Sequence, residues 1–169
     1  MGRFKHVNKG WFAGIPVSVV DSKAYKSLGG NAAKLLTILS RHYNSNNNGD
    51  LAITKSIIGD WMTKNTMYSA KDELFRKGFI VINAYGGRSA FGRKLPSLYA
   101  LTYYPMNELK ERNGETRYAH YQPNQSSLNY WKKGANPDYK TKKQRDAQYK
   151  RDVKKLQYPL LNNTPIAQK

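Results

Sequence analysis

Residues 51–85, LAITKSIIGDWMTKNTMYSAKDELFRKGFIVINAY, contain the elements that decide the fold. The first two are a short strand and a short helix. Leu51 to Ile53 is short and apolar and predicts a brief strand. Thr54 can cap the helix that follows, because its hydroxyl can accept a hydrogen bond from an amide of the first turn. The buried face of that short helix is expected to hold Ile57, Ile58 and Trp61.

A second, longer helix is predicted over Lys64 to Lys77. Thr63 is its expected N-cap, and Gly78 stands where a glycine commonly ends a helix. The side chains at helical spacing that should face the core are Met67, Ala70 and Leu74. The two helices therefore form a consecutive pair with a short turn between them.

Two strands with a basic loop between them follow the helix pair. Phe79 to Tyr85 and Ser97 to Thr102 are rich in aliphatic and aromatic residues and predict paired strands. The connecting segment, Gly86 to Pro96, contains three glycines and three cations but no acidic residue. We therefore expect a flexible hairpin loop with a cationic tip.

The clearest helix of the chain lies before the pair, over Asn31 to about His42. One face at helical spacing carries Ala32, Leu35, Leu36, Leu39 and Tyr43. Before this helix, Ser22 to Leu28 predicts a short capped turn, and Trp11 to Val20 predicts an extended, strand-like lead-in. After it, Asn44 to Asp50 has the composition of a turn.

This order of elements resembles that of the winged helix-turn-helix family. The resemblance covers roughly 80 residues, namely Asn31 to His42, Thr54 to Trp61, Thr63 to Lys77 with its ending Leu-Phe-Arg-Lys-Gly-Phe-Ile, and the ribbon to Thr102. Lys-Ser-Leu, Ala-Lys-Leu-Leu and Asn-Asn-Gly-Asp-Leu before the pair are similar to a set common in small phage, plasmid and integrative-element proteins. One departure is that the turn Met62-Thr63-Lys64 lacks the glycine of many such turns.

The resemblance implies an α+β protein with a winged helix of three helices and a two- or three-stranded β-wing. Residues 22–104 are the expected winged-helix domain, after a basic arm and lead-in over residues 1–21. Aliphatic residues become rare after Pro105, so residues 105–169 are expected to form a basic, Tyr-rich, partly helical C-terminal extension with a weak core.

The balance of charge points to a polyanionic partner. The 169 residues contain 29 Lys and Arg against 11 Asp and Glu, a formal net charge of +18. This excess is far above the magnitude of about 2 to 8 that suffices for solubility in a small domain. It favours a nucleic acid over an anionic membrane surface, because no basic amphipathic helix with exposed large apolar residues stands out.

The face of the Lys64 to Lys77 helix opposite its buried residues is the expected DNA-reading surface, because an α-helix fits the major groove. The residues predicted to contact DNA there are Lys64, Asn65, Thr66, Tyr68, Ser69, Lys71 and Arg76. Asn65 can pair with adenine through two hydrogen bonds, whereas Lys64 and Lys71 suit phosphates. The alternative is a plain solvated helix face.

Three further regions could contact phosphates. The hairpin tip presents Arg88, Arg93 and Lys94, which can enter a minor groove or follow the backbone. The extension supplies Lys132, Lys133, Lys142, Lys143, Arg145, Lys150 and Arg151, and Thr141 to Leu156 is predicted to be helical. The N-terminal arm could also reach DNA, with terminal disorder as the alternative.

Aromatic residues recur through the extension, at Tyr118, Tyr121, Tyr130, Trp131, Tyr139, Tyr149 and Tyr158. Rings interleaved with cations can stack on the bases of single-stranded nucleic acids. The other reading is that these rings pack back onto the winged helix.

Enzymatic chemistry is not expected. There is no cysteine, and His6, His42 and His120 lie far apart without ligand-spaced partners, so neither a metal site nor a cofactor is predicted. The adjacent carboxylates Asp72 and Glu73 diverge by about 100° on a helix. No run of about 18 apolar residues predicts a membrane span. A cytoplasmic, nucleoid-associated protein of prokaryotic or phage origin is the expectation.

Two functions remain open at this point. The first is a double-stranded DNA-binding regulator of transcription, or a replication accessory factor, of a mobile element. The second is a basic adaptor subunit of a larger nucleoprotein complex, in host defence or phage counter-defence, that grips RNA or single-stranded DNA. A homodimer is compatible with the first function, although no heptad or apolar surface stripe requires it.

Overall fold

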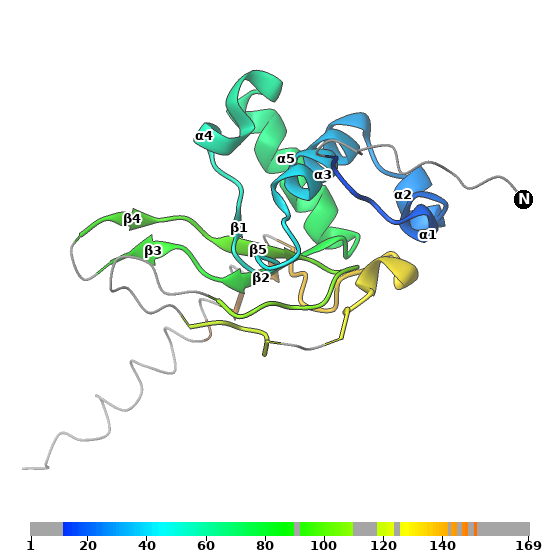
Figure 1. Ribbon diagram of the computed structural model, residues 1–169. Helices are drawn as coiled ribbons and strands as arrows, with labels where there is room; N and C mark the ends of the chain where they lie inside the picture. The colour runs from blue at the N-terminus through cyan, green and yellow to red at the C-terminus, as the bar shows by residue number, and fades with distance from the viewer. Residues whose placement is uncertain are drawn as a thin grey trace, which may run out of the picture. The chain divides into compact units, whose positions relative to one another are not determined.

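The computed structural model describes residues 12–89, 92–109, 118–123, 126–141, 143–144, 147–148 and 151. The chain divides into two compact units, residues 1–137 and 138–169. In the described part, the first unit is a mixed α+β domain (Figure 1). Its α-helices are α1 (Val17–Val20), α2 (Lys23–Lys26), α3 (Gly30–His42), α4 (Lys55–Ile58) and α5 (Lys64–Arg76). Its strands are β1 (Leu51–Ala52), β2 (Ile80–Ala84), β3 (Gly87–Arg88), β4 (Lys94–Leu95) and β5 (Leu98–Leu101), and two 3-10 turns cover η1 (Gly59–Trp61) and η2 (Tyr130–Lys133).

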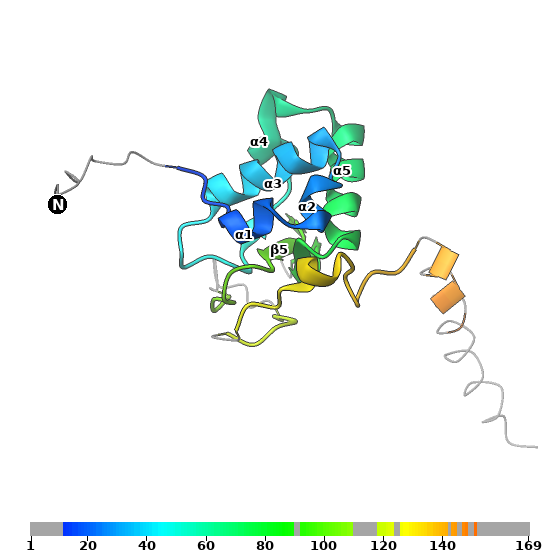
Figure 2. The ribbon, with the colours of Figure 1, turned by 90° about the vertical axis from the view of Figure 1, so that its right-hand side faces the viewer.

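The helices α3 and α5 form the main helical contact of the domain (Figure 2). The predicted residues Ala32, Leu35, Leu36 and Leu39 of α3 are buried, whereas Tyr43 follows the end of the helix and is half-buried. The predicted inward residues of α5, which are Met67, Ala70 and Leu74, are buried as well. The Thr63 hydroxyl caps α5 by accepting the amide of Thr66 at 3.3 Å.

A three-stranded antiparallel sheet in the order β1-β5-β2 lies against the helices. Ile80 pairs with Leu101 and Leu51 pairs with Tyr99, so β5 is the central strand. Gly78 has a φ of 79° between α5 and β2, and a Cβ there would lie 2.8 Å from the backbone of Tyr130. The predicted strands and the glycine that ends α5 are thus confirmed.

The segment predicted as a flexible loop contains a second, two-stranded ribbon. In this ribbon β3 and β4 pair antiparallel, with Gly87 opposite Leu95 and Arg88 opposite Lys94. Figure 1 shows the ribbon projecting from the end of the three-stranded sheet. The amide of Ser89 donates to the carbonyl of Arg93 at 2.9 Å, which extends the pairing toward the tip.

The prediction of a boundary at Pro105 was wrong, because the first compact unit runs to Pro137. Met106 is 2 % exposed and packs with Val81 and Ala100 on the sheet, and Trp131 is 6 % exposed and belongs to the main core. The segment after Pro105 is poor in aliphatic residues, but two of its large side chains, Met106 and Trp131, are buried in the domain.

Buried asparagines attach this segment to the domain. The side chain of Asn48 accepts the Leu101 amide at 2.7 Å and donates to the carbonyl of Pro105 at 2.9 Å. The side chain of Asn83 accepts the Tyr121 amide at 3.1 Å and donates to the carbonyl of Gly49 at 3.1 Å. Since both asparagines are completely buried, their hydrogen bonds replace water and fix the path of the chain beneath the sheet.

Three smaller predictions also need correction. Val17–Val20 is a helical turn rather than an extended lead-in, because the Val19 and Val20 amides donate to the carbonyl of Pro16. Trp61 is 48 % exposed and lies outside the core. Thr54 makes no side-chain cap, since its hydroxyl bonds that of Ser56 at 2.8 Å.

The connection between α4 and α5 does contain a glycine, but this glycine lies before the turn Met62-Thr63-Lys64. The helix α4 ends at Ile58, and Gly59 follows with a φ of 53°. This left-handed conformation favours glycine, because a Cβ is poorly tolerated there. Gly59 therefore starts the reversal that leads through η1 into α5.

The predicted helix of the extension is described only in part. Residues 143–144, 147–148 and 151 are helical, and the others between Thr141 and Leu156 lie outside the described residues, except Thr141 itself. The Thr141 hydroxyl accepts the Gln144 amide at 3.3 Å, and the Gln144 side chain accepts the Thr141 amide at 2.8 Å. This reciprocal pair is a capping box, which marks a helix start.

Candidate nucleic-acid interface

The outward side of α5 carries all seven of the residues predicted for DNA contact on this helix. Lys64, Asn65, Tyr68, Ser69 and Arg76 are exposed, while Thr66 and Lys71 are half-buried. Because Met67, Ala70 and Leu74 face the core, this set lies on the opposite side and flanks of the helix. Six of these residues fall into two groups, one toward the sheet and one toward the start of α3, and Arg76 is the last residue of the helix.

The group toward the sheet is a cluster of lysines and rings, which we call the Tyr68 cluster. Lys71 Nζ lies 4.9 Å from the centre of the Tyr68 ring and 6.0 Å from that of Tyr99, and Lys64 Nζ lies 5.9 Å from the Tyr68 ring. Ammonium groups at this distance are attracted to a ring face. Tyr68, 47 % exposed, is therefore held upright on the surface between two cations.

The ring of Tyr99 anchors this cluster to β5. Burial raises the pKa of Tyr99, a hydrogen bond with Ser97 acts to lower it, and the nearby Tyr68 raises it further. Tyr99 therefore stays neutral at physiological pH, and its buried ring gives Lys71 a fixed apolar support. The cluster links the outward side of α5 to the strand that continues into the ribbon.

The group toward α3 lines a hollow of about 410 Å³. Its walls come from the start of α3 and from one flank of α5, and they are Gly29, Gly30, Asn31, Asn65, Thr66, Ser69, Ala70 and Glu73. The amides and hydroxyls of Asn65, Thr66 and Ser69 can donate and accept hydrogen bonds without carrying charge. Such groups can distinguish hydrogen-bond patterns, which charged groups bound to phosphates cannot.

Glu73 closes one end of this hollow and ties α5 to α3. Its carboxylate accepts the Gly29 amide at 3.0 Å and lies 3.2 Å from Lys77 Nζ. Burial acts to raise the pKa of Glu73, but the Gly29 amide, Lys77 and Arg76 together outweigh it and leave the pKa below its usual value. Lys77 also donates to the carbonyl and hydroxyl of Ser27, so this lysine is occupied within the fold.

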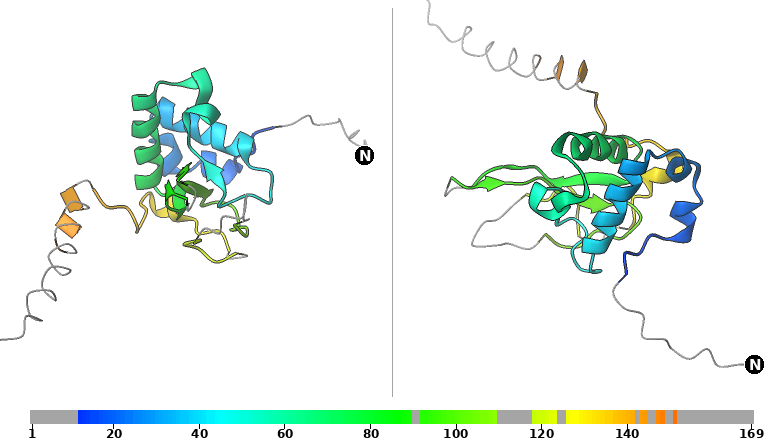
Figure 3. Two further views of the ribbon diagram at one scale, coloured as in Figure 1. Left: turned by 90° about the vertical axis from the view of Figure 1, so that its left-hand side faces the viewer. Right: turned by 90° about the horizontal axis from the view of Figure 1, so that it is seen from above.

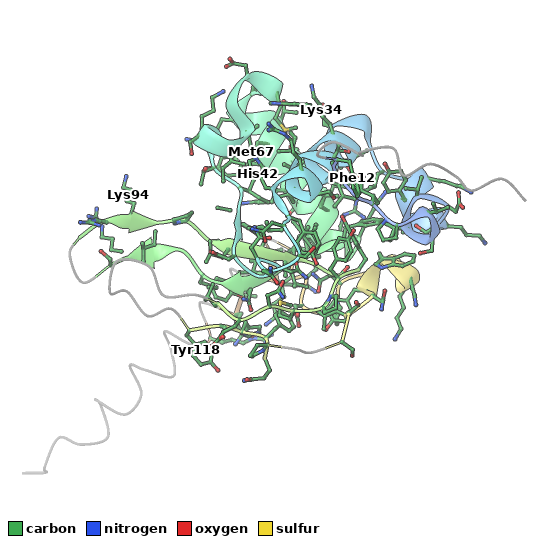
Figure 4. All side chains as sticks on the ribbon, viewed as in Figure 1. Phe12, Lys34, His42, Met67, Lys94 and Tyr118 are labelled. Carbon is green, nitrogen blue, oxygen red and sulfur yellow. The ribbon has the colours of Figure 1, made fainter. Side chains whose placement is uncertain are left out.

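The ribbon places like charges directly opposite one another. Arg88 and Lys94 are ladder partners and both are exposed, and Arg93 is exposed beside them. Figure 4 shows the Lys94 side chain projecting from the ribbon. Like charges at opposite positions of a strand pair destabilise it. An anion bound between them would remove that repulsion.

Three other basic regions of the first unit can be located relative to α5: the ribbon, α2 with η2, and the C-terminal end of α3. The ribbon of β3 and β4 extends to one side of α5, and α2 with η2 lies on the other (Figures 1 and 3). Lys132 and Lys133 of the predicted set are exposed on η2. The C-terminal end of α3, with exposed Arg41, points away from α5 (Figure 3).

The remaining residues predicted to contact phosphates lie in the second unit or outside the described residues. Lys143 and Arg151 are exposed and belong to the second unit. Lys142, Arg145 and Lys150 lie outside the described residues, as do the arm cations Arg3, Lys5 and Lys9 with His6.

Some aromatic residues of the extension pack onto the domain, and one is presented to solvent. Trp131 is buried, and Tyr121 and Tyr130 are half-buried against Val81, Ala100 and Met106. Tyr118, by contrast, is 87 % exposed (Figure 4). Tyr149 and Tyr158 lie outside the described residues. Among the described rings next to the sheet, packing therefore prevails over presentation to solvent.

Within the described residues, no group of three or more His, Asp or Glu side chains is placed to hold a metal ion. The described helices include none that is both long and apolar enough to cross a membrane. Comparison of the chain with protein-family models, curated proteins and solved structures gave no match.

Three residues of this surface were not predicted from the sequence. Tyr99 supports α5 from the sheet, Glu73 of α5 accepts the Gly29 amide at the start of α3, and Lys34 Nζ lies 5.5 Å from the centre of the exposed Trp61 ring. The ion pair of Glu73 with Lys77 could have been predicted, because the two residues are four positions apart in the sequence of a helix. The other partners are distant in sequence and carry no local signal.

Proposed function

We propose that this chain is a winged-helix protein that binds double-stranded DNA with α5 in the major groove and the β3–β4 ribbon as the wing. The order α3, β1, α4, α5, β2, ribbon and β5, with a β1-β5-β2 sheet, supports the winged-helix assignment. The observation that carries the function is the exposed face of α5 beside a ribbon with opposed cations, in a chain of net charge +18.

The two flanks of α5 suit different parts of a duplex. Lys64 and Lys71 supply ammonium groups for phosphates at the edge of the groove. Asn65 is exposed and neutral, so it can offer its amide to a base edge, adenine being the base that matches both its donor and acceptor. Tyr68 has a fixed ring that can contact a thymine methyl group.

A duplex suits the described surface better than a single strand does. Single-strand binders present rings on which successive bases stack, whereas Trp131 is buried and Tyr121 and Tyr130 are half-buried against the sheet. The role that follows is a sequence-reading factor of a mobile element, either a transcriptional regulator or a replication accessory. Its expected place is the cytoplasm, at the nucleoid.

The test is fluorescence anisotropy with random duplex, a selected duplex site, single-stranded DNA and structured RNA, each from about 50 to about 200 mM salt. We expect a preference for duplex and a steep loss of affinity with salt. A preference for single strands or RNA would overturn the proposal and favour the adaptor function.

Two substitutions separate base reading from phosphate binding. Asn65→Ala should reduce the preference for the selected site, by about 1 to 3 kcal/mol of discrimination. Arg93→Ala should weaken binding to every duplex alike and lower the salt slope by about 1. Arg41→Ala removes one exposed charge from the far end of α3 and is the matched control. Equal losses on all sequences from Asn65→Ala and Arg93→Ala would remove α5 as the reading element.

A further inference from the structure

We infer that α2 and η2 form a second phosphate-binding surface, which extends the DNA site past α5 on the side opposite the wing. This inference rests on the proposed function, because the phosphates are those of the same duplex. The surface is defined by Lys23 on α2 and by Lys132 and Lys133 on η2.

These three lysines line one hollow, although Lys23 precedes Lys132 and Lys133 by more than 100 residues in the chain. The hollow has a volume of about 500 Å³, and its other lining residues are Ser18, Asp21, Ser22, Ala24, Trp131 and Gly134. The lysines are all exposed, and Asp21 is the single acidic residue among the lining residues. Three ammonium groups beside hydroxyls make a surface suited to phosphate oxygens.

The two lysines of η2 are displayed on an anchored turn. Trp131 lies between them and the core at 6 % exposure, and its indole N–H donates to Asn129 Oδ1 at 3.2 Å. Lys132 Nζ lies 5.7 Å from the centre of the Trp131 ring, and the Gly134 amide closes the turn by donating to the Trp131 carbonyl at 3.0 Å. The backbone that carries both lysines is therefore fixed before any ligand arrives, which lowers the entropic cost of binding.

Direct contacts place this surface at the C-terminal end of α5. The Asn136 amide donates to the carbonyl of Arg76, the last residue of α5, at 3.0 Å. The Lys77 ammonium donates to the Ser27 hydroxyl at 2.9 Å, just after α2. Arg76, which is exposed, is therefore the residue of α5 nearest in the chain to this attachment.

The arrangement indicates which ligand the surface serves. A duplex that receives α5 would meet the wing on one flank and the α2–η2 surface on the other (Figure 3). Lysine is a point charge on a flexible stem, so it binds phosphate without reading sequence. The surface therefore contributes affinity and footprint length, while α5 retains the base contacts.

The experiment compares three duplexes with the same core site: one of about 12 base pairs, and two in which the site is extended by about one helical turn on one side or on the other. The variants are Lys132→Gln/Lys133→Gln and the charge-conserving Lys132→Arg/Lys133→Arg. We expect the wild type to gain affinity from extension on one side. The glutamine variant should lose most of that gain and lower the salt slope by up to about 2 on the extended duplex, while the arginine variant should keep both.

The outcomes distinguish this inference from the proposed function. If the wild type binds none of the duplexes, both the proposed function and this inference are refuted. If Lys64→Gln/Lys71→Gln weakens the short duplex but Lys132→Gln/Lys133→Gln leaves the extension gain intact, only the α2–η2 surface is refuted. An equal loss on both lengths would also refute it. Displacement by inorganic phosphate but not by chloride at equal ionic strength would assign the hollow to a free anion instead.

Discussion

The helices α3 and α5 have the same length and pack against each other, yet they use their residues differently. Each has 13 residues. The helix α3 buries Ala32, Leu35, Leu36, Ile38, Leu39 and Ser40, whereas α5 buries only Met67, Ala70 and Leu74. The difference teaches that α3 contributes more to the core, while α5 is fixed by a narrower buried stripe and leaves its outward side exposed.

The largest expected effect is loss of stability from α3. Leu36→Ala removes a completely buried side chain and should lower the free energy of unfolding by about 2 to 5 kcal/mol, because it leaves a cavity in the core. Ser69→Ala on the exposed side of α5 should change it by less than about 0.5 kcal/mol. Urea denaturation of both variants measures the contrast, and equal losses would contradict the division between the helices.

A smaller effect is expected where the two helices are joined by charge. Glu73→Gln should cost roughly 1 kcal/mol at neutral pH, since it weakens the contacts with Gly29 and Lys77. Because the pKa of Glu73 is lowered by folding, its contribution is complete above the unfolded value of about 4.3 and disappears as the pH falls through the folded value.

The difference in stability between wild type and Glu73→Gln should therefore shrink from pH 7 to about pH 3. Glu108→Gln makes the same change of charge at an exposed position and is the control. A difference that stays constant with pH would mean that the carboxylate does not join α3 and α5 in the way the hydrogen bonds indicate.

The α3 and α5 helices and the strands β2 and β5 could be predicted from the sequence, because their buried faces repeat at fixed spacing. The spacing of Leu35 and Leu39, or of Met67 and Leu74, shows that each pair lies on one side of its helix, whatever that side packs against. The same logic identified the outward side of α5, since it is what remains when the buried stripe is removed.

The covering of the sheet after Pro105 could not be predicted in this way. Met106 and Trp131 are isolated large side chains without periodicity, and the asparagines that fix the segment look like ordinary turn residues. Asn48 stands in a run of polar residues but bonds β5 and Pro105. Such long-range hydrogen bonds leave no trace in local composition. For the same reason the contact of α2 with η2 was visible only in the structure.

The most direct test of the central claim is an NMR titration of the full chain with duplex DNA, following the backbone amides. The account predicts that the largest shifts fall on the outward residues of α5, above all Asn65, Tyr68 and Ser69, and on the ribbon around Arg88. The C-terminal turn of α3 should shift least, because it points away from that surface. Shifts concentrated on α3 or on the underside of the sheet, with α5 unchanged, would contradict the claim that α5 is the DNA-binding helix.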